Sequence, residues 1–343
     1  MTTIIDVARV AGVSTATVSR VLNNHPQVDP GLAMAVRKAA KQLGYRPSRV
    51  ARSLRTRQSR VWALLISDIR NPFFTDMVRG VEDVAYGAGY SIILCNAEED
   101  AGKEASYLEL AVAENVGGVI LTPTAASTDL GALHEFGIPA VLADRTIDPQ
   151  RVDSVVIDNA GGARQAVEHL IAGGYERIAC ITGPLDKTTG SSRYAGYRMA
   201  LQGAGQPLDE SLVRVANFRE NGGRVAMQGL LGGDETPDAV FVANNLMTIG
   251  ALHAIADAGL QIPHQIAVIG FDDMSWATLL RPALTTVAQP TYDLGVETGR
   301  LLRSRIDGYV GAARTVILSP SLRIRDSSQP KPSLARRSRS RHA

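Results

Sequence analysis

The chain has 343 residues, of which 45% are hydrophobic and 20% charged, and its formal net charge is +2. This length exceeds one small core and predicts two or three domains. No apolar run approaches the roughly 20 residues that cross a bilayer, which argues against a membrane protein. The first six residues lack the basic start and apolar core of a signal peptide, so we expect a cytoplasmic protein. Cys95 and Cys180 lie in apolar, strand-like runs and are expected to be buried, reduced thiols.

The small net charge hides a strong asymmetry along the chain. Residues 1–60 contain 11 Lys and Arg against 2 Asp and Glu, a surplus of +9. Residues 331–343 add +5, so residues 61–330 carry −12. A basic N-terminal segment joined to an acidic body predicts that only this segment meets a polyanion such as DNA.

The first elements in chain order predict a helix-turn-helix. A short first helix presents an apolar face, and Gly12 supplies the tight turn that follows it. Ser14 is placed to cap a second helix, because its hydroxyl can accept from the free amides of the first turn. The apolar positions expected on the two helices are Ile5, Val7, Ala8, Val10 and Ala11, then Val18, Val21 and Leu22.

The second helix has the properties of a DNA recognition helix. Thr15 and Ala16 lie at its N-terminal end, where short side chains let the backbone approach base edges in the major groove. Arg20 is long enough to reach a guanine edge or a phosphate. Thr17 and Ser19 are expected to position the helix on phosphates.

A third helix and a basic segment follow. Asp29 as N-cap and Pro30 at the first helical position open the helix, and Gly44 ends it. We therefore expect a DNA-binding domain over residues 1–46. Residues 47–60 predict a hinge whose helix is too short to be stable alone in water, so it would order only against DNA or a symmetry mate. Its single large apolar residue, Leu54, can wedge between base steps of the minor groove; a protease-sensitive linker is the alternative.

From Val61 onward, apolar strand-like runs alternate with helical stretches. Repeated strand–helix units predict parallel sheets with helices on both faces, and this length predicts two α/β lobes. The expected strands are Val61–Ile66, Tyr90–Cys95, Gly118–Thr122, Ala140–Ala143, Val155–Ile157, Arg177–Thr182, Ala239–Ala243 and Ile266–Gly270. Ligands bind such folds beyond the carboxyl ends of strands. Polar clusters occupy those places at Asp68–Phe74, Asp144–Arg145, Asp158–Asn159, Gly183–Arg193, Asn244–Asn245 and Asp272–Asp273.

The last residues, 327–343, are rich in Ser, Pro and Arg and have no apolar periodicity. This composition predicts a disordered basic tail. The tail contains no leucine heptads, so we expect a dimer rather than a tetramer held by a helical bundle.

Motifs spread over about residues 3–325 resemble those of the LacI/GalR family of bacterial repressors. Within that family, Cys180–Thr188 and Asn221–Gly223 are similar to ribose-type repressors. The motifs that carry the resemblance are Asp6–Ala8, Ala11–Ser14, Thr17–Asn23, Leu43–Tyr45, Val50–Leu54, Asn71–Phe74, Ile269–Asp273 and Leu284–Val287.

The resemblance implies a helix-turn-helix head, a hinge helix and a two-lobed body over residues 61–326, shaped like the periplasmic sugar-binding proteins. It divides the body into an N-terminal lobe, about 61–160 plus a return at 290–320, and a C-terminal lobe, about 161–289, with the effector between them. By the same resemblance, the DNA-contacting residues are those already named on the second helix with Asn23 at its end, and Ala51, Leu54 and Arg55 in the hinge.

The resemblance also implies a set of effector-binding residues. Chemistry supports a sugar, because Arg donates a fork of N–H groups, Asp accepts twice, and aromatic rings cover an apolar sugar face. Asn245 departs from the Asp that is frequent at its position, and Lys187 beside the pocket leaves a phosphorylated sugar open. The matching positions are Phe73 and Phe74 in the first lobe, Lys187, Thr189, Arg193, Phe218, Asn245 and Asp272 in the second, and Trp276 as a further ring.

The sequence thus predicts a homodimeric repressor that binds a pseudo-palindromic operator and responds to a small ligand, most simply ribose or another pentose or hexose. Whether the ligand releases or strengthens DNA binding stays open. The alternatives are a purine-type or co-repressor-dependent regulator of the same family, and a sugar-binding transport protein. An enzyme is disfavoured, because the chain has no G-x-S-x-G elbow, no P-loop and no G-x-G-x-x-G after a strand. We expect no catalytic residue, no cofactor and no metal, since the six His show no ligand spacing.

Overall fold

The structure is a computed structural model that describes residues 2–22, 28–45, 59–147, 152–233 and 236–331. It divides into two compact units, Met1–Ser59 and Arg60–Ala343, here called the head and the body. The expected DNA contacts at Asn23, Ala51, Leu54 and Arg55 lie outside the described residues.

The head contains three helices, α1 (Ile4–Ala11), α2 (Thr15–Leu22) and α3 (Pro30–Gln42). The Ser14 hydroxyl accepts from the backbone N–H of Thr17 at 3.1 Å, which confirms the expected cap of α2. Asp29 accepts from the first two free amides of α3, with Pro30 at the first helical position, as the sequence predicts. Local capping therefore fixes where the helices begin.

The head has a small apolar core. Ile5 and Val10, expected on the buried face of α1, are 59% and 50% exposed, so that part of the prediction is wrong. At 100° per residue they fall outside the arc of about 100° that contains the buried positions. The core residues are Val7, Ala8, Val18, Val21, Val36, Ala39 and Ala40.

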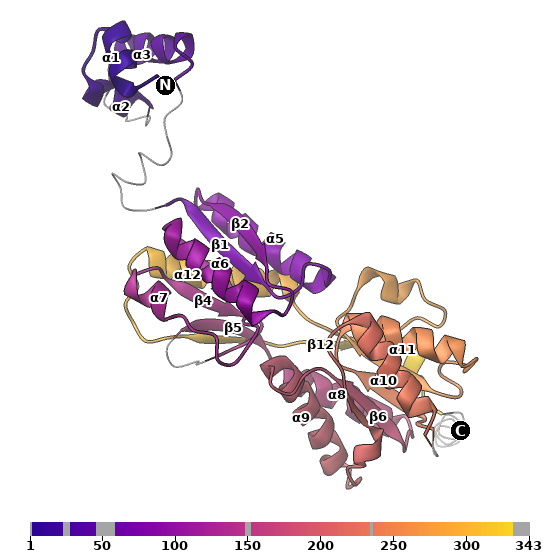
Figure 1. The fold of residues 1–343 in the computed structure, drawn as a ribbon. Helices are drawn as coiled ribbons and strands as arrows, with labels where there is room; N and C mark the ends of the chain where they lie inside the picture. The colour runs from indigo at the N-terminus through magenta and orange to yellow at the C-terminus, as the bar shows by residue number, and fades with distance from the viewer. Residues whose placement is uncertain (1, 23–27, 46–58, 148–151, 234–235, 332–343) are drawn as a thin grey trace, which may run out of the picture. The chain divides into compact units, whose positions relative to one another are not determined.

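The body contains two six-stranded sheets, one in each lobe, which confirms the two-lobed α/β fold (Figure 1). The first-lobe sheet has the order β11-β5-β4-β3-β1-β2, and all of its pairings are parallel. Its strands are β1 (Val61–Ile66), β2 (Ser91–Asn96), β3 (Gly118–Leu121), β4 (Ala140–Ala143), β5 (Asp153–Ile157) and β11 (Thr315–Leu318).

The second-lobe sheet has the order β12-β10-β9-β8-β6-β7. Its pairings are parallel except for β10 with β12. Its strands are β6 (Ile178–Thr182), β7 (Val213–Val215), β8 (Ala239–Val242), β9 (Ala267–Phe271), β10 (Thr285–Ala288) and β12 (Ser321–Arg323). The strands expected from the sequence are present in both sheets.

Helices cover the faces of both sheets (Figure 1). The first lobe has α5 (Pro72–Gly87), α6 (Ala101–Ala113), α7 (Gly131–Glu135) and α12 (Thr291–Ile306); the second has α8 (Asn159–Ala172), α9 (Thr188–Gly203), α10 (Glu220–Leu231) and α11 (Asn245–Asp257). Helix α12 comes late in the chain yet packs on α5, so close that a Cβ at Gly80 would lie 2.2 Å from the Tyr292 carbonyl oxygen. The first lobe is thus completed by a segment far away in sequence.

The chain crosses between the lobes three times, after β5, after β10 and after β11. Beyond the last strand, residues 327–331, expected in the disordered tail, lie on the second lobe. The Ser327 hydroxyl donates to the Val268 carbonyl oxygen at 2.6 Å, and the Lys331 ammonium pairs with Asp238 at 2.7 Å.

Cys95 and Cys180 are buried free thiols, as expected. Burial raises the pKa of both. Within the described part of the chain, no helix is long and apolar enough to span a membrane. The same residues contain no group of three or more His, Cys, Asp or Glu side chains that could hold a metal ion.

Candidate ligand-binding pocket between the lobes

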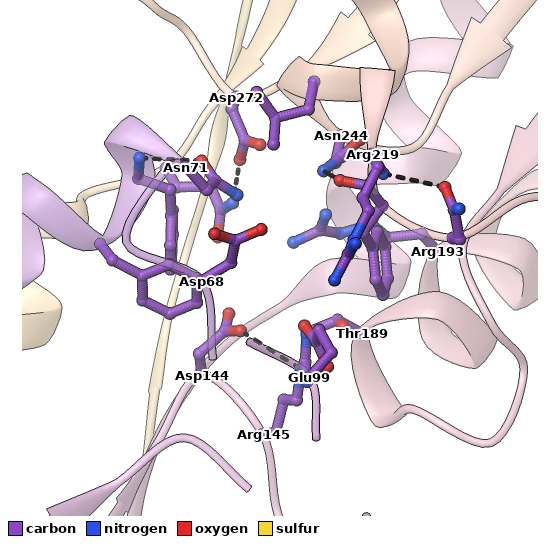
Figure 2. Close-up of a pocket in the computed structure, with 16 residues that line it drawn as sticks. Asp68, Asn71, Glu99, Asp144, Arg145, Thr189, Arg193, Arg219, Asn244 and Asp272 are labelled. Carbon is purple, nitrogen blue, oxygen red and sulfur yellow. Dashed lines mark hydrogen bonds and ion pairs between the residues drawn. The ribbon is translucent and has the colours of Figure 1, made fainter. Parts of the chain in front are cut away.

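A pocket lies at the carboxyl ends of the strands, where the two lobes face each other. Its lining comes from loops that follow β1, β2 and β4 in the first lobe and from the ends of β7, β8, β9 and β10 and from α9 in the second. Figure 2 shows their side chains surrounding a common space. The lining residues are Asp68, Asn71, Phe73, Phe74, Glu99, Asp144, Arg145, Thr189, Arg193, Asn217, Phe218, Arg219, Asn244, Leu246, Asp272 and Gln289.

The first-lobe wall contains a closed ion pair. Two nitrogens of the Arg145 guanidinium donate to the two Glu99 carboxylate oxygens at 2.6 and 2.8 Å. Burial opposes the charge of Arg145, but the Glu99 carboxylate beside it raises the pKa of the guanidinium above its ordinary value. Arg145 also donates to the Pro123 carbonyl oxygen at 3.2 Å, while its buried Nε has no hydrogen-bond partner among the described residues.

Beside this pair, Asp144 is buried without a full set of partners. Its Oδ1 has no hydrogen bond in the structure, and its Oδ2 lies 3.9 Å from Arg145 Nε, beyond hydrogen-bond distance. Burial raises the pKa of Asp144 to about 6. A buried carboxylate oxygen without a donor is costly, so this oxygen is available to a hydroxyl or N–H group of a ligand.

The second-lobe wall is built around Asp272 and Arg193. Asp272 accepts from the backbone N–H of Asn245 at 3.1 Å and from the Gln289 amide. Arg193 donates to Asn159 Oδ1 at 2.7 Å and to the Ala243 carbonyl oxygen at 2.6 Å. Burial lowers the pKa of Arg193 from its usual value. These hydrogen bonds fix both side chains at the edge of the cavity.

Aromatic rings supply the apolar part of the lining. Phe73 and Phe74, in the first turn of α5, pack edge to face with centroids 5.1 Å apart. Phe218 has a positive φ of 59° and lies against Gly183, where a Cβ would come within 2.1 Å of the ring. The Phe218 ring also faces the Arg145 guanidinium of the other lobe at 5.6 Å. Rings from both lobes therefore line one cavity.

Several polar contacts join the lobes around the cavity. Asn245 Nδ2 donates to Asn71 Oδ1 at 2.8 Å, and Arg219 donates to the Glu98 carbonyl oxygen at 3.2 Å. The Lys187 ammonium donates to the Thr124 carbonyl oxygen. The two walls are thus connected by hydrogen bonds as well as by the chain.

The structure brings together six of the nine residues that the sequence proposed for the effector site: Phe73, Phe74, Thr189, Arg193, Phe218 and Asp272 line the pocket. The other three lie outside the lining. Lys187 is engaged with Thr124, Asn245 is buried behind Asn71, and Trp276 packs against the core of the second lobe.

Sequence reasoning proposed no role for the remaining lining residues. Five of them lie in the polar clusters that the sequence places at strand ends, and this position indicates a ligand site. They are Asp68, Asn71, Asp144, Arg145 and Asn244. The other lining residues lie outside the polar clusters named from the sequence. Some of them follow strands that the sequence pattern does not predict. These residues are Glu99, Asn217, Arg219, Leu246 and Gln289.

In the head, the expected base-reading residues lie on one exposed side of α2. Thr15, Ala16 and Arg20 are exposed, while Thr17 and Ser19 are half-buried. The Thr17 hydroxyl lies 3.0 Å from that of Ser14. The buried side of α2 carries Val18 and Val21, so the helix presents its polar side to solvent.

Comparison with known proteins agrees with both units. Residues 3–48 match the family of bacterial regulatory proteins described as the lacI family, and residues 167–328 match a periplasmic binding protein-like domain. The ribose operon repressor of Escherichia coli strain K12 is 39% identical over 297 residues, which cover 86% of this chain and 90% of that protein.

Two solved structures extend the likeness over nearly the whole chain. The transcriptional regulator CelR in complex with cellobiose is 36% identical, with a TM-score of 0.74, covering 95% of this chain and all of the other. The lac repressor dimer bound to operator and the anti-inducer ONPF is 28% identical, with a TM-score of 0.85, covering 96% and 99%.

A helix-turn-helix head joined to a two-lobed, periplasmic-binding-protein-like body defines a DNA-binding transcriptional regulator. The chain belongs to the LacI family of these regulators. Members of this family are transcriptional regulators and not enzymes.

Proposed function

We propose that this protein is a cytoplasmic repressor that binds a pseudo-palindromic operator as a homodimer and is controlled by a neutral monosaccharide, D-ribose being the first candidate, bound between the lobes. The ligand class rests on one observation: three buried carboxylates, those of Asp68, Asp144 and Asp272, line one cavity together with aromatic rings. Carboxylates accept from sugar hydroxyls, and rings cover the apolar face of a sugar.

The charges of the pocket favour a neutral ligand over a phosphorylated one. Arg145 is paired with Glu99, Arg193 donates to two protein oxygens, and Lys187 donates to a backbone carbonyl outside the lining. Arg219 also lines the pocket, and its guanidinium donates to the Glu98 carbonyl oxygen rather than to a carboxylate. The lining nevertheless contains four carboxylates, Asp68, Glu99, Asp144 and Asp272, against these two lining arginines and Arg219. A phosphate would meet this surplus of negative charge, which disfavours any anionic ligand.

The free volume of the pocket is small, about 30 Å³. About 10–15 Å³ of such volume holds one water. A sugar would therefore need the lobes, or the side chains between them, to stand further apart than in this structure.

Isothermal titration calorimetry of the full chain tests the ligand class. The probes are D-ribose, ribose 5-phosphate, cellobiose and hypoxanthine, which represents the purine-type alternative. We expect D-ribose to bind and Arg193→Ala to remove that binding. Arg224→Ala is the matched control, because this arginine pairs with Asp257 on the surface, outside the pocket. Tighter binding of ribose 5-phosphate than of D-ribose would contradict the neutral-ligand proposal.

The exposed side of α2 supports the DNA part of the proposal. We expect Arg20→Ala to weaken binding to a palindromic duplex, selected from a random pool, by at least about tenfold while changing non-specific binding little. Arg9→Ala is the control, since Arg9 is exposed on α1 and pairs with Asp6. Equal losses for the two variants would contradict a base-reading role for Arg20. Adding D-ribose to the same assay determines whether the ligand releases or strengthens DNA binding.

An exposed apolar edge supports a homodimer. Strand β2 is the last strand of the first-lobe sheet, and its consecutive residues Ile93 and Leu94 are 43% and 41% exposed. Exposed apolar edge strands are usually covered by a partner. We propose a second copy of the chain as that partner. Leu94→Glu should convert a dimer into a monomer in size-exclusion chromatography with light scattering, whereas Glu109→Ala on α6 should not; an unchanged mass for Leu94→Glu would exclude this edge.

A further inference from the structure

Asn245 is buried, only 1% exposed, and lies outside the pocket lining, yet it reaches across the cleft. It stands at the first position of α11 in the second lobe, and its Nδ2 donates to Oδ1 of Asn71 at 2.8 Å. Asn71 is the N-cap of α5 in the first lobe and lines the pocket. The two amides therefore form a polar contact between the lobes directly beside the ligand site.

Two backbone amides fix the direction of this contact. The Phe73 N–H donates to Asn71 Oδ1 at 3.0 Å, and the Leu246 N–H donates to Asn245 Oδ1 at 2.6 Å. A side-chain NH₂ group cannot accept either of these bonds, so the oxygen of each amide must face its backbone N–H. Asn245 is consequently the donor in the pair and Asn71 the acceptor.

The filled oxygen of Asn71 determines what this residue offers to a ligand. Its Oδ1 already accepts two hydrogen bonds, from Phe73 and from Asn245. Both side-chain hydrogen bonds of Asn71 to the described part of the chain are made by this oxygen, and none by its Nδ2. Figure 2 shows Asn71 at the edge of the cavity, near Asp272. The pocket thus gains a hydrogen-bond donor beside its carboxylate acceptors.

We propose that Asn245 is a positioning residue that holds the Asn71 amide from the opposite lobe, with its NH₂ group directed to the ligand. Because the contact spans the cleft, Asn245 adds its hold to that of the Phe73 N–H only when the lobes are together. The proposal rests on the proposed function for the nature of the ligand, a sugar oxygen that accepts from Asn71. The orientation of the two amides is independent of the ligand and can be tested without one.

The first test is thermal unfolding of the ligand-free chain. Asn71→Asp adds a carboxylate near Asp272 (Figure 2), but it keeps a good N-cap and can still accept from Phe73 and Asn245, so we expect its Tm to fall less than that of Asn245→Asp. Asn245→Asp sets a carboxylate against the Asn71 oxygen and near Asp272, so its Tm should fall by about 3 °C or more. Asn245→Ala, which only removes the contact, should lie between the two. If the Tm of Asn245→Asp is equal to or higher than that of Asn71→Asp, the assignment of Asn245 as donor and Asn71 as acceptor is overturned.

The second test is the affinity for D-ribose by calorimetry. Asn71→Asp removes the donor, and Asn245→Asp turns or displaces it, so each should weaken binding by about tenfold. Asn245→Ala leaves Phe73 holding the amide and should weaken binding clearly less. A purely structural role for Asn245 would instead weaken binding equally in its Ala and Asp variants, which overturns the proposal. If the wild-type chain does not bind D-ribose, the proposed ligand fails, and the order of the Tm values still decides the direction of the amide pair.

Discussion

Each lobe places a carboxylate at the same point of the same turn. Asp144 follows β4 and donates its N–H to the Val155 carbonyl oxygen of β5 at 2.9 Å; Asp272 follows β9 and donates to the Val287 carbonyl oxygen of β10 at the same distance. Both have a positive φ, 67° and 77°. The carboxylates differ, because Asp272 accepts two protein hydrogen bonds, whereas Asp144 Oδ1 accepts none.

This difference separates two roles that one residue type can have in a binding site. A carboxylate that protein donors hold, such as Asp272, is fixed in one orientation and also supports its neighbours. A buried carboxylate such as Asp144, whose Oδ1 has no donor and whose Oδ2 has only a distant ion pair with Arg145, costs folding free energy that a donor from a ligand can offset. The four changes that follow separate these roles, from the largest expected effect to the smallest.

Asp272→Ala should have the largest effect, since it removes a ligand acceptor and also leaves the Asn245 N–H and the Gln289 amide without their partner. We expect the affinity for D-ribose to fall at least about a hundredfold and the free energy of unfolding to fall by about 1–3 kcal/mol. Calorimetry and urea unfolding measure the two losses. Unchanged stability would contradict the supporting role of Asp272.

Asp144→Asn should weaken D-ribose binding but stabilise the ligand-free chain. The variant replaces a buried carboxylate that accepts no hydrogen bond at Oδ1 with a neutral amide of nearly the same shape, so the free energy of unfolding at pH 7.5 should rise by about 1–2 kcal/mol. We therefore expect Asp144→Asn to raise the free energy of unfolding and Asp272→Ala to lower it. A loss of stability in both variants would contradict the difference between the two carboxylates.

Acidification should act through Asp144. Burial raises its pKa to about 6 from the model-peptide value of 3.8, so the folded state takes up its proton first as the pH falls. The destabilisation by this group is therefore present above about pH 6 and is relieved progressively as the pH falls toward 4. D-ribose, which requires the carboxylate as acceptor, should bind more weakly below about pH 6. The Asp144→Asn variant should lack this pH dependence of D-ribose binding in calorimetry. If the variant keeps it, a group other than Asp144 titrates.

Glu99→Gln should produce the smallest change. The Glu99 carboxylate is one of the charges that raise the pKa of Asp144, and it also occupies the Arg145 guanidinium. With that charge removed, the pKa of Asp144 should fall, because Arg145 is free to interact with it. We expect the pH midpoint of D-ribose binding to move below its wild-type position while the affinity at pH 7.5 changes only a few-fold. A midpoint that moves upward would contradict this coupling.

The family resemblance names residues of both walls. In the second lobe Thr189, Arg193, Phe218 and Asp272 line the pocket, whereas Lys187, Asn245 and Trp276 do not. In the first lobe both named residues, Phe73 and Phe74, line it. Asp144 lies in a polar cluster that the sequence places after a recognisable apolar strand, but nothing local distinguishes it from the neighbouring clusters. What makes it special is the absence of a donor, which depends on every element packed around it.

Other parts of the molecule depend on contacts between distant segments. Gln289 follows β10, a strand whose residues Thr285 and Thr286 give no apolar run, although both are fully buried. Helix α12 contains many charged residues. It packs closely on α5 because glycines such as Gly295 allow the two backbones to touch. Lys187 has the charge expected beside a phosphate, but its carbonyl partner lies 63 residues away in the other lobe.

The route of the chain through the body has a mechanical consequence. The chain crosses between the lobes three times, an odd number. It therefore enters the body in the first lobe, at β1, and its last described residues, 327–331, lie in the second lobe, which they contact through hydrogen bonds and an ion pair. The head is joined covalently to the start of β1, hence to the first lobe alone. The lobe that contributes Arg193 and Asp272 has no direct chain connection to the head. Within one copy, a ligand bound to the second lobe can therefore act on the head through the chain only by moving the first lobe.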